Sequence, residues 1–275
     1  MIIDGIVVLF NPSKDVINNI KSYQPLLNKL FVVDNSNDIN KEVVDDLTKL
    51  DNVIYYSLNG NKGIAKALKE GMKLSISDKA DMTLTMDQDS IFPTDKFDDI
   101  VHILSENINK YAIIGLNFNS TDVEKKLVET NLWLTSGNFI NNSDYLLIEG
   151  FKEELFIDWV DFDLCEQFYT IGKKVAYINE ISIKHTIGNP IEFKFFGKTK
   201  HAMNHSLIRY YYRYRNGLYL YKKNKKFYRK KYLHDLYIDK LKILIFEKNK
   251  MAKFKMIRKG RKDARRNILG PYKED

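Results

Sequence analysis

The sequence predicts an α/β protein with a mostly parallel, Rossmann-like sheet and flanking helices, followed by a basic helical C-terminal extension. Two observations give this prediction. Through residues 2–117, apolar β-branched runs alternate with stretches of helical spacing. Such alternation is typical of parallel strands joined by right-handed helical crossovers. Near residue 198 the chain also changes from acidic to strongly basic.

The first predicted strand, residues 2–10, is nearly all apolar, as expected of a central parallel strand buried on both faces. Asn11, Pro12 and Ser13 end it and begin a helix that runs towards Tyr23. Further strands are predicted at residues 30–33, 53–57, 83–86 and 112–116, and helices at 41–50, 64–77 and 95–107. Ile64, Ala67, Leu68, Gly71, Met72 and Ser75 share one face of the 64–77 helix.

Beyond residue 117 the pattern is less regular. An apolar run covers residues 132–140, a helix is expected at 163–171, and strands are expected at 175–178 and 182–184. Two helical stretches, 201–226 and 228–258, follow. We therefore predict one domain over residues 1–200 and a basic, aromatic helical region over 201–275.

Composition limits the class of protein. The 275 residues are 44% hydrophobic and 29% charged, as in a soluble globular protein with a large core. The single cysteine, Cys165, cannot form an internal disulfide, which favours a reducing, cytoplasmic setting. We expect no signal peptide, and no apolar run has the length of a membrane span.

The net charge of +8 is unevenly distributed. Residues 1–197 hold 19 lysines and 30 acidic residues, whereas residues 198–266 hold 24 basic and four acidic residues. Every arginine lies at or beyond Arg209. Such a tail is attracted to anionic surfaces: nucleic acid, anionic lipid headgroups or a diphosphate.

Two carboxylates, Asp87 and Asp89, follow the strand at 83–86 with one residue between them. The carboxyl ends of strands in an α/β sheet are where such sheets bind ligands. Adjacent carboxylates are costly unless a cation neutralises them, and a hard divalent cation on a diphosphate would do so. The alternative is an ordinary acidic turn.

A second acidic group, Asp158, Asp161 and Asp163, lies among aromatic residues. Desolvation and mutual repulsion there are expected to raise a carboxyl pKa, which suits a general base. The alternative is a cap for the helix that follows, since Asp is favoured at helix N-termini.

These motifs keep a fixed order along the chain. They are Val7-Val8-Leu9-Phe10-Asn11-Pro12, Val32-Val33-Asp34-Asn35-Ser36, Asn61-Lys62-Gly63-Ile64, Asp87-Gln88-Asp89-Ser90, Thr135-Ser136-Gly137, the segment 155–163 and His185-Thr186-Ile187-Gly188. In this order and spacing, residues 2–220 resemble the family 2 glycosyltransferases with the GT-A fold. Within that family the chain looks most like the bacterial rhamnosyltransferase branch.

The resemblance implies a donor half over residues 1–117 and an acceptor half over 118–200. The donor-binding residues it implies are Phe10, Asn11, Asp34, Asn61, Gly63, Asp87 and Gln88. Asp34 would contact the nucleoside and Asp87 would lie near the ribose. Asp89 and His185 would bind Mn²⁺ or Mg²⁺. The alternatives are an Asx turn at Asp34, an ordinary helix start after Asn61, and a structural His185.

The resemblance also makes Asp161 the general base. The acceptor-binding residues it implies are Trp133, Ser136, Gly137, Trp159 and Asp163. The family commonly has Glu where this chain has Asp163. Either tryptophan could instead belong to the core.

Farther along, His205, Arg209 and Arg215 are candidates for binding a diphosphate, because Arg matches phosphate geometry. The alternative is a solvated basic helix.

The predicted function is an inverting, metal-dependent transfer of a sugar to a glycan or lipid-linked saccharide in bacterial surface polysaccharide synthesis. By resemblance, L-rhamnose from dTDP-rhamnose is the favoured donor; the alternative is a galactofuranosyl, galactosyl or glucosyl transfer from a UDP-sugar. We expect a peripheral location on the inner face of the cell membrane. The basic region either binds that anionic surface or packs on the body or on a second subunit in a homodimer. A nucleic-acid-binding protein is the rival of a different class.

Overall fold

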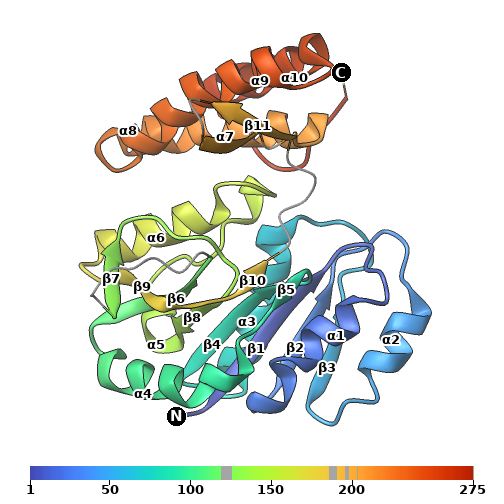
Figure 1. Ribbon diagram of the computed structural model, residues 1–275, viewed down its shortest axis with the longest axis vertical. Coiled ribbons are helices and arrows are strands. Elements are labelled where there is room, and N and C mark those ends of the chain that lie inside the picture. The colour runs from blue at the N-terminus through green and yellow to red at the C-terminus, as the bar shows by residue number, and fades with distance from the viewer. Residues whose placement is uncertain (119–125, 186–190, 196–197, 203, 275) are drawn as a thin grey trace. The chain divides into compact units, whose positions relative to one another are not determined.

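A computed structural model describes residues 1–118, 126–185, 191–195, 198–202 and 204–274, with only the backbone at 185, 191–195 and 198–202 (Figure 1). The chain forms two compact units. The first comprises Met1–Glu153 and Asp161–Thr186, and the second comprises Glu154–Val160 and Ile187–Asp275. The boundary predicted at residue 200 thus lies after residue 186, and a short earlier segment joins the second unit.

An eight-stranded sheet, in the order β3-β2-β1-β4-β8-β6-β9-β7, is the centre of the first unit (Figure 1). Its parallel first half consists of β1 (Ile3–Leu9), β2 (Leu30–Asp34), β3 (Val53–Ser57) and β4 (Met82–Asp87). All seven residues of β1 are buried, which explains why the sequence there is a continuous apolar run. The predicted parallel sheet is confirmed.

Helices connect these strands. They are α1 (Val16–Lys21), α2 (Lys41–Leu47), α3 (Ile64–Ser77) and α4 (Phe97–Asn107), with short 3₁₀ helices at Gln24–Leu26 and Thr94–Lys96. In α3, Gly71 lies against Ile6 of β1, where a Cβ atom would be 2.7 Å from Ile6 Cγ2. The helical face predicted from the sequence is therefore the one that packs on the sheet.

The other half of the sheet is mixed. It contains β6 (Tyr111–Asn117), β7 (Leu127–Thr130), β8 (Asn138–Asn141) and β9 (Lys174–Ser182), with α5 (Asn142–Tyr145), a 3₁₀ turn at Glu153–Leu155 and α6 (Val160–Thr170) between them. The four-residue strands β7 and β8 were not predicted as separate strands, because so short a run carries little periodicity. A small sheet pairs β5 (Ser90–Ile91) with β10 (Lys184–His185).

The sheet topology brings the predicted site to one edge. The strand β8 is antiparallel to both β4 and β6, and β9 is parallel to β6, so β1, β4, β6 and β9 all end at the same edge. Because α6 runs back towards the start of β9, its N-terminus also lies at that edge. Asp89 and Asp161 are thus placed at the same side of the sheet.

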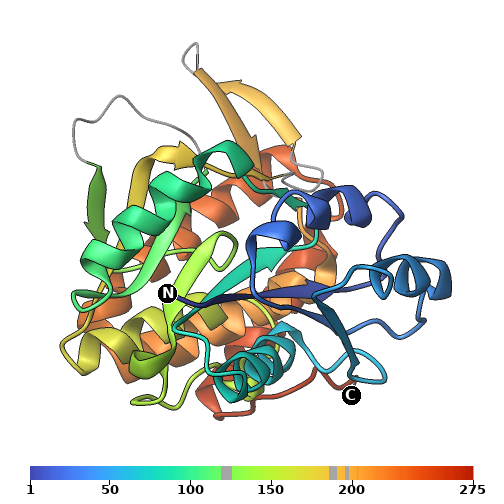
Figure 2. The same cartoon turned by 90° about the horizontal axis from the view of Figure 1, so that it is seen from below.

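The second unit is mostly helical. It contains α7 (Leu207–Lys223), α8 (Lys225–His234), a π-helical turn at Asp235–Asp239, α9 (Lys240–Phe246) and α10 (Lys250–Arg265). The hairpin of β11 (Ile191–Phe195) and β12 (Lys198–Ala202) is seen as two adjacent arrows in Figure 2. The predicted helix at 201–226 therefore begins later, because residues 201 and 202 are in a strand. Among the described residues, no helix combines the length and apolarity needed to cross a membrane.

Asparagines divide the helices that the sequence suggested were continuous. Asn224 caps α8 by accepting a hydrogen bond from the Phe227 N–H at 3.1 Å. Asn249 has a left-handed conformation, with φ of 53°, between α9 and α10. Asn is among the residues that best tolerate this conformation. The reversal it produces brings α10 back along α7 (Figure 1).

The contact between α7 and α10 depends on one glycine. A Cβ atom at Gly260 would lie 2.4 Å from the backbone oxygen of Tyr211. Tyr210, Tyr214 and Ile257 form the apolar cluster beside this contact. Because the obstacle is backbone, a side chain at position 260 requires the two helices to separate.

We expect Gly260→Ala to destabilise the second unit by about 1–3 kcal/mol, since overpacking of a helix crossing outweighs the better helix propensity of Ala. Denaturant unfolding of the full chain measures this. Lys262→Ala, an exposed change on the same helix, is the matched control. Equal stability of the two variants would show that the helices adjust without cost.

Candidate active site

The two-carboxylate turn is fastened to the end of the neighbouring strand. The side-chain amide of Gln88 accepts a hydrogen bond from the Phe10 N–H at 2.8 Å and donates one to the Phe10 carbonyl at 3.2 Å. Asp87 is partly exposed and Asp89 is exposed. The amide of Gln88 thus joins β1 to the turn, and its contact with a donor stays a prediction. The two acids remain accessible.

Ser136 supports the turn from behind. Its Oγ accepts a hydrogen bond from the Asp87 N–H at 3.1 Å and lies 2.9 Å from Ser90 Oγ. It is only 1% exposed. Gly137, with φ of 74°, donates its N–H to the Thr85 carbonyl at 2.8 Å. The predicted acceptor contacts of Ser136 and Gly137 are therefore corrected, because both residues shape the turn from inside the protein.

The backbone places His185 next to this turn. In the pairing of β5 with β10, His185 lies opposite Ser90, the residue that follows Asp89. The side chain of His185 lies outside what the structure describes. Carboxylate oxygens with an imidazole form a donor set that suits Mn²⁺, and carboxylates alone suit Mg²⁺. The residues collected at this edge thus fit a divalent cation.

Asp34 is almost completely buried, at 1% exposure. One carboxylate oxygen accepts a hydrogen bond from the Ser36 N–H at 2.9 Å, and the other accepts one from the Tyr55 hydroxyl at 2.8 Å. This is the Asx turn that was the alternative for this residue. The predicted nucleoside contact at Asp34 is corrected, since the carboxylate is enclosed and already bonded.

Asn35 is a residue that the sequence reasoning missed. Its side chain accepts a hydrogen bond from the Lys62 N–H at 2.7 Å and donates one to Asn61 Oδ1 at 3.2 Å. The same Asn61 oxygen accepts a hydrogen bond from the Gly63 N–H at 3.0 Å. The end of β2 thereby holds the loop before α3. The only sign of this role in the sequence was that Asn35 is a polar residue next to Asp34.

Several predicted donor residues remain at the surface of this edge. Phe10 is 43% exposed, and Asn11 and Asn61 are also exposed. Gly63, with φ of 89°, directly precedes α3. Backbone N–H groups at the start of a helix favour anions such as phosphate. A nucleotide could therefore reach Phe10, Asn11, Asn61 and the start of α3.

Of the three acids in the segment 158–163, only Asp161 combines accessibility with a position in the first unit. It lies in the first turn of α6 and is partly exposed. The Asp163 side chain is 1% exposed and accepts hydrogen bonds from Gln167 Nε2 at 2.6 Å and Lys152 Nζ at 3.4 Å. The predicted acceptor contact of Asp163 is corrected, because its carboxylate is enclosed.

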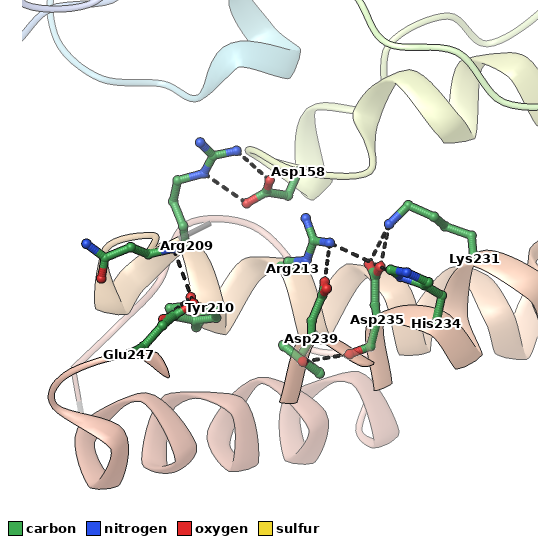
Figure 3. A network of polar contacts seen from close by, with 11 residues as sticks. Asp158, Arg209, Tyr210, Arg213, Lys231, His234, Asp235, Asp239 and Glu247 are labelled. Atoms are coloured by element: carbon green, nitrogen blue, oxygen red, sulfur yellow. Dashed lines mark hydrogen bonds and ion pairs between the residues drawn. The ribbon is translucent and has the colours of Figure 1, made fainter. Parts of the chain in front are cut away.

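Asp158 belongs to the second unit, where Arg209 binds its carboxylate through Nε at 3.3 Å and Nη2 at 2.6 Å (Figure 3). Burial disfavours ionisation, but the Arg209 guanidinium outweighs it and holds the pKa of Asp158 below its usual value. The expectation that the acids of this segment have raised pKa values is therefore wrong for Asp158. Arg209 was predicted to bind a diphosphate. In the structure its guanidinium forms an ion pair with Asp158, and the diphosphate contact stays a prediction.

Both tryptophans pack against other residues of the protein, which was the alternative to an acceptor contact for each of them. Trp133 stacks on Tyr177 with ring centroids 4.0 Å apart, and its indole lies against Gly115. In the second unit, Trp159 packs against Gly217, where a Cβ atom would be 2.8 Å from the ring. The predicted acceptor contact of Trp159 is thus corrected, since it is 3% exposed.

The helix α7 holds the segment that precedes Asp161. Asn216 Nδ2 donates hydrogen bonds of 2.8 Å to the carbonyls of Leu155, Ile157 and Asp158. Arg215 Nη2 donates to the carbonyls of Glu154 at 3.1 Å and Leu155 at 3.0 Å. Arg215 has no exposed surface, so its prediction as a diphosphate ligand is corrected.

His205 carries no charge that would attract an anion. Burial, with a contribution from the nearby Arg209, lowers its pKa to about 4. The imidazole is therefore neutral at physiological pH, and its assignment as a diphosphate ligand stays a prediction.

A group of possible metal ligands, His234, Asp235 and Asp239, also lies in the second unit, with ligand atoms within 4.8 Å of one another. Arg213 contacts Asp235 at 3.0 Å and Asp239 at 2.6 Å, and Lys231 contacts Asp235 at 2.7 Å (Figure 3). Two cations thus already neutralise the two carboxylates. We interpret the group as a structural ion-pair network.

Residues 14–146 match the family model described as glycosyl transferase family 2. A dTDP-rhamnosyl transferase of Shigella flexneri, RfbF, is 26% identical over 245 residues, covering 80% of both chains.

Solved structures show the same fold. S. aureus TarS has a TM-score of 0.56 at 14% identity, covering 94% of this chain but only 42% of TarS. The fragment TarS 1-349 with UDP-GlcNAc gives the same score and identity and is 70% covered. GalNAc-T7 with UDP, GalNAc and Mn²⁺ has a TM-score of 0.63 at 11% identity, covering 96% of this chain and 55% of GalNAc-T7. This chain thus spans about half the length of two of these neighbours.

The lowered pKa of His205 predicts a pH-dependent stability. As pH falls below about 6.5, the unfolded chain binds a proton at this histidine while the folded protein does not, so stability decreases until about pH 4. The slope is up to about 1.4 kcal/mol per pH unit. We expect His205→Asn to remove this loss between neutral pH and about pH 5.

The measurement is urea unfolding of a Trp133→Phe background, in which Trp159 reports on the second unit. His102→Asn, a change at an exposed histidine of α4, is the control. An unchanged pH slope in His205→Asn would contradict the prediction.

Proposed function

Because the chain is a family 2 glycosyltransferase with the GT-A fold and is similar to a rhamnosyltransferase, we propose that it transfers L-rhamnose from dTDP-rhamnose to a saccharide hydroxyl with inversion. One observation carries the proposal. The exposed Asp89 and the partly exposed Asp161 lie at the same edge of the sheet, where parallel α/β sheets bind ligands. One acid is available for the donor diphosphate and the other for the acceptor.

The donor nucleotide occupies the exposed part of the edge. Phe10 and Asn11 extend from β1, and Asn61 and Gly63 lead into α3. Exposed amide groups and helix N–H groups can bind a base, a ribose or a phosphate. The relative RfbF is named as a dTDP-rhamnosyl transferase, and this supports the choice of donor.

Asp89 and His185, with Asp87 beside the ribose, would hold a divalent cation, either Mn²⁺ or Mg²⁺. When bound, such a cation neutralises the donor diphosphate and the charge that develops on the leaving group. The register that places His185 opposite Ser90 supports this assignment. So does the bracing of the acid turn by Gln88, because a braced turn keeps both carboxylates in position.

Asp161 accepts the proton of the acceptor hydroxyl as that oxygen attacks the anomeric carbon opposite the departing diphosphate. Inverting glycosidases also place their base on the face away from the leaving group. Asp161 lies in the first turn of α6, where a helix N-terminus favours a negatively charged side chain.

The acceptor in this proposal is a lipid-linked saccharide, presented at the inner face of the cell membrane during surface polysaccharide synthesis. Support comes from the second unit, where basic residues greatly outnumber acidic ones and Leu241, Leu244 and Ile245 are more than half exposed. Packing on a second subunit is the alternative for this surface. A nucleic-acid role is not needed to explain the charge, because Arg209, Arg213 and Arg215 have partners within the unit.

A UDP-sugar is the second candidate donor, because TarS 1-349 and GalNAc-T7 are structures with UDP-GlcNAc or UDP. Thermal shift with dTDP-rhamnose, UDP-galactose, UDP-galactofuranose and UDP-glucose, each with Mn²⁺ or Mg²⁺, separates the two. We expect the largest stabilisation from dTDP-rhamnose. If only a UDP-sugar stabilises the protein, that sugar takes the place of dTDP-rhamnose as the proposed donor. If no nucleotide sugar stabilises it, the proposed donor site is refuted.

Asp161→Asn should abolish transfer while leaving donor binding unchanged, because the carboxylate accepts a proton and does not hold the nucleotide. Loss of a general base costs on the order of 10²–10⁴ in rate. The measurement pairs turnover on the true acceptor with donor affinity from calorimetry. Near-normal turnover would assign the base to another residue.

Asp89→Ala should remove the metal dependence of donor binding, since it deletes a carboxylate ligand of the cation. Calorimetry with dTDP-rhamnose, with and without Mn²⁺, measures the effect. Asp95→Ala removes an exposed carboxylate from the short helix that follows β5 and serves as the control. If Mn²⁺ strengthens binding equally in both variants, Asp89 is not a ligand.

A further inference from the structure

A groove in the second unit has no part in the proposed chemistry. It has a volume of about 750 Å³ and lies along α9 and α10. That volume is in the range of small-molecule sites. Its lining residues are Lys240, Met251, Ala252, Phe254, Lys255, Ile257, Arg258, Arg261 and Arg265.

The groove combines a cationic and an apolar lining. Five of the nine lining residues are Lys or Arg, and none is acidic. Among the described residues, none of the five forms an ion pair with an acid. Arg213 and Lys231 in the same unit do so. The positive charge of this groove therefore remains available to an anion.

Arg261, whose side chain also hydrogen bonds Tyr232, has one donor left unsatisfied by the described residues. Its Nε atom is buried and has no hydrogen-bond acceptor within the described part of the chain. Burial and the nearby Arg261 together lower the pKa of Lys240, so the two cations share one environment. Holding like charges close together is unfavourable unless an anion lies between them.

The surface beside the groove is apolar. Leu241, Leu244 and Ile245 of α9 are 52%, 55% and 54% exposed, and Met251 at the start of α10 is 86% exposed. Single exposed apolar residues are ordinary, but a group on one short helix is typical of an interaction surface. A cationic groove beside such a group matches an amphiphile with a phosphate and a hydrocarbon part.

We propose that this groove binds the phosphate of an anionic membrane phospholipid while the apolar side chains of α9 enter the lipid interface. A second copy of the chain fits less well, because it would set one cationic groove against another. The inference rests on the proposed function only for its membrane location. It is independent of the donor and of Asp161.

The test compares two triple variants of the full chain that remove equal charge. Lys255→Gln, Arg258→Gln and Arg261→Gln change the groove. Lys225→Gln, Lys226→Gln and Lys230→Gln change exposed positions of α8 outside it. Binding is measured by co-sedimentation with phosphatidylcholine vesicles, with and without phosphatidylglycerol.

We expect the wild type to bind only the phosphatidylglycerol vesicles. The groove triple should lose affinity on the order of 100-fold, because each cation near an anionic surface contributes a factor of roughly five. The α8 triple should lose much less. Equal losses would overturn the proposal in favour of diffuse charge, as would no binding by the wild type at low salt.

Two further arms keep the test decisive. Lys255 and Arg258 are exposed, so their double variant replaces the triple if the loss of Arg261 impairs folding. Inorganic phosphate, added at constant ionic strength, should compete with vesicles for the wild type. Thermal stabilisation by inorganic phosphate without vesicle binding would mean a site for soluble phosphate and overturn the lipid assignment.

The thermal shift caused by the donor should be unchanged in both triple variants. Failure of the lipid proposal is therefore separable from failure of the donor proposal.

Discussion

The interaction on which the second unit depends most is the hold of α7 on residues 154–158. Phe156, Asp158 and Trp159 all have positive φ angles, a conformation that costs about 1–3 kcal/mol for each non-glycine residue. Asn216 and Arg215 offset this cost by hydrogen bonding the carbonyls of residues 154, 155, 157 and 158. Because these hydrogen bonds join α7 to four carbonyls of the segment, the clamp stabilises its strained backbone. The segment leads directly into α6 and its first-turn acid.

Polar residues at the edge of the large sheet fall into two classes. Asp34 and Ser136 are enclosed and bonded to the backbone, so they keep the loops in shape. Asn61, Asp89 and Asp161 retain accessible surface and can meet a ligand. A ligand site needs both classes, since accessible groups are useful only when inner ones hold them in place.

The basic charge of the C-terminal region is divided in a similar way. Arg209, Arg213 and Arg215 are used inside the second unit, where they bind carboxylates or carbonyls. In the part of the chain that the structure describes, the cations of the groove along α9 and α10 form no ion pair with an acid. A count of charge therefore cannot tell a structural arginine from one that is available to an anion.

The sequence by itself determined the order of strands and helices in the first half, because each apolar run there is continuous and long enough to show its period. It also located Asp89 and Asp161, since both are polar residues at the ends of clear elements. Only the tertiary structure decided that Gln88 and Arg215 brace the protein. The reason is that a side chain's partner can lie 60 or more residues away, as Arg215 and Leu155 do, separated by 60 positions. Local spacing carries no information about such a contact.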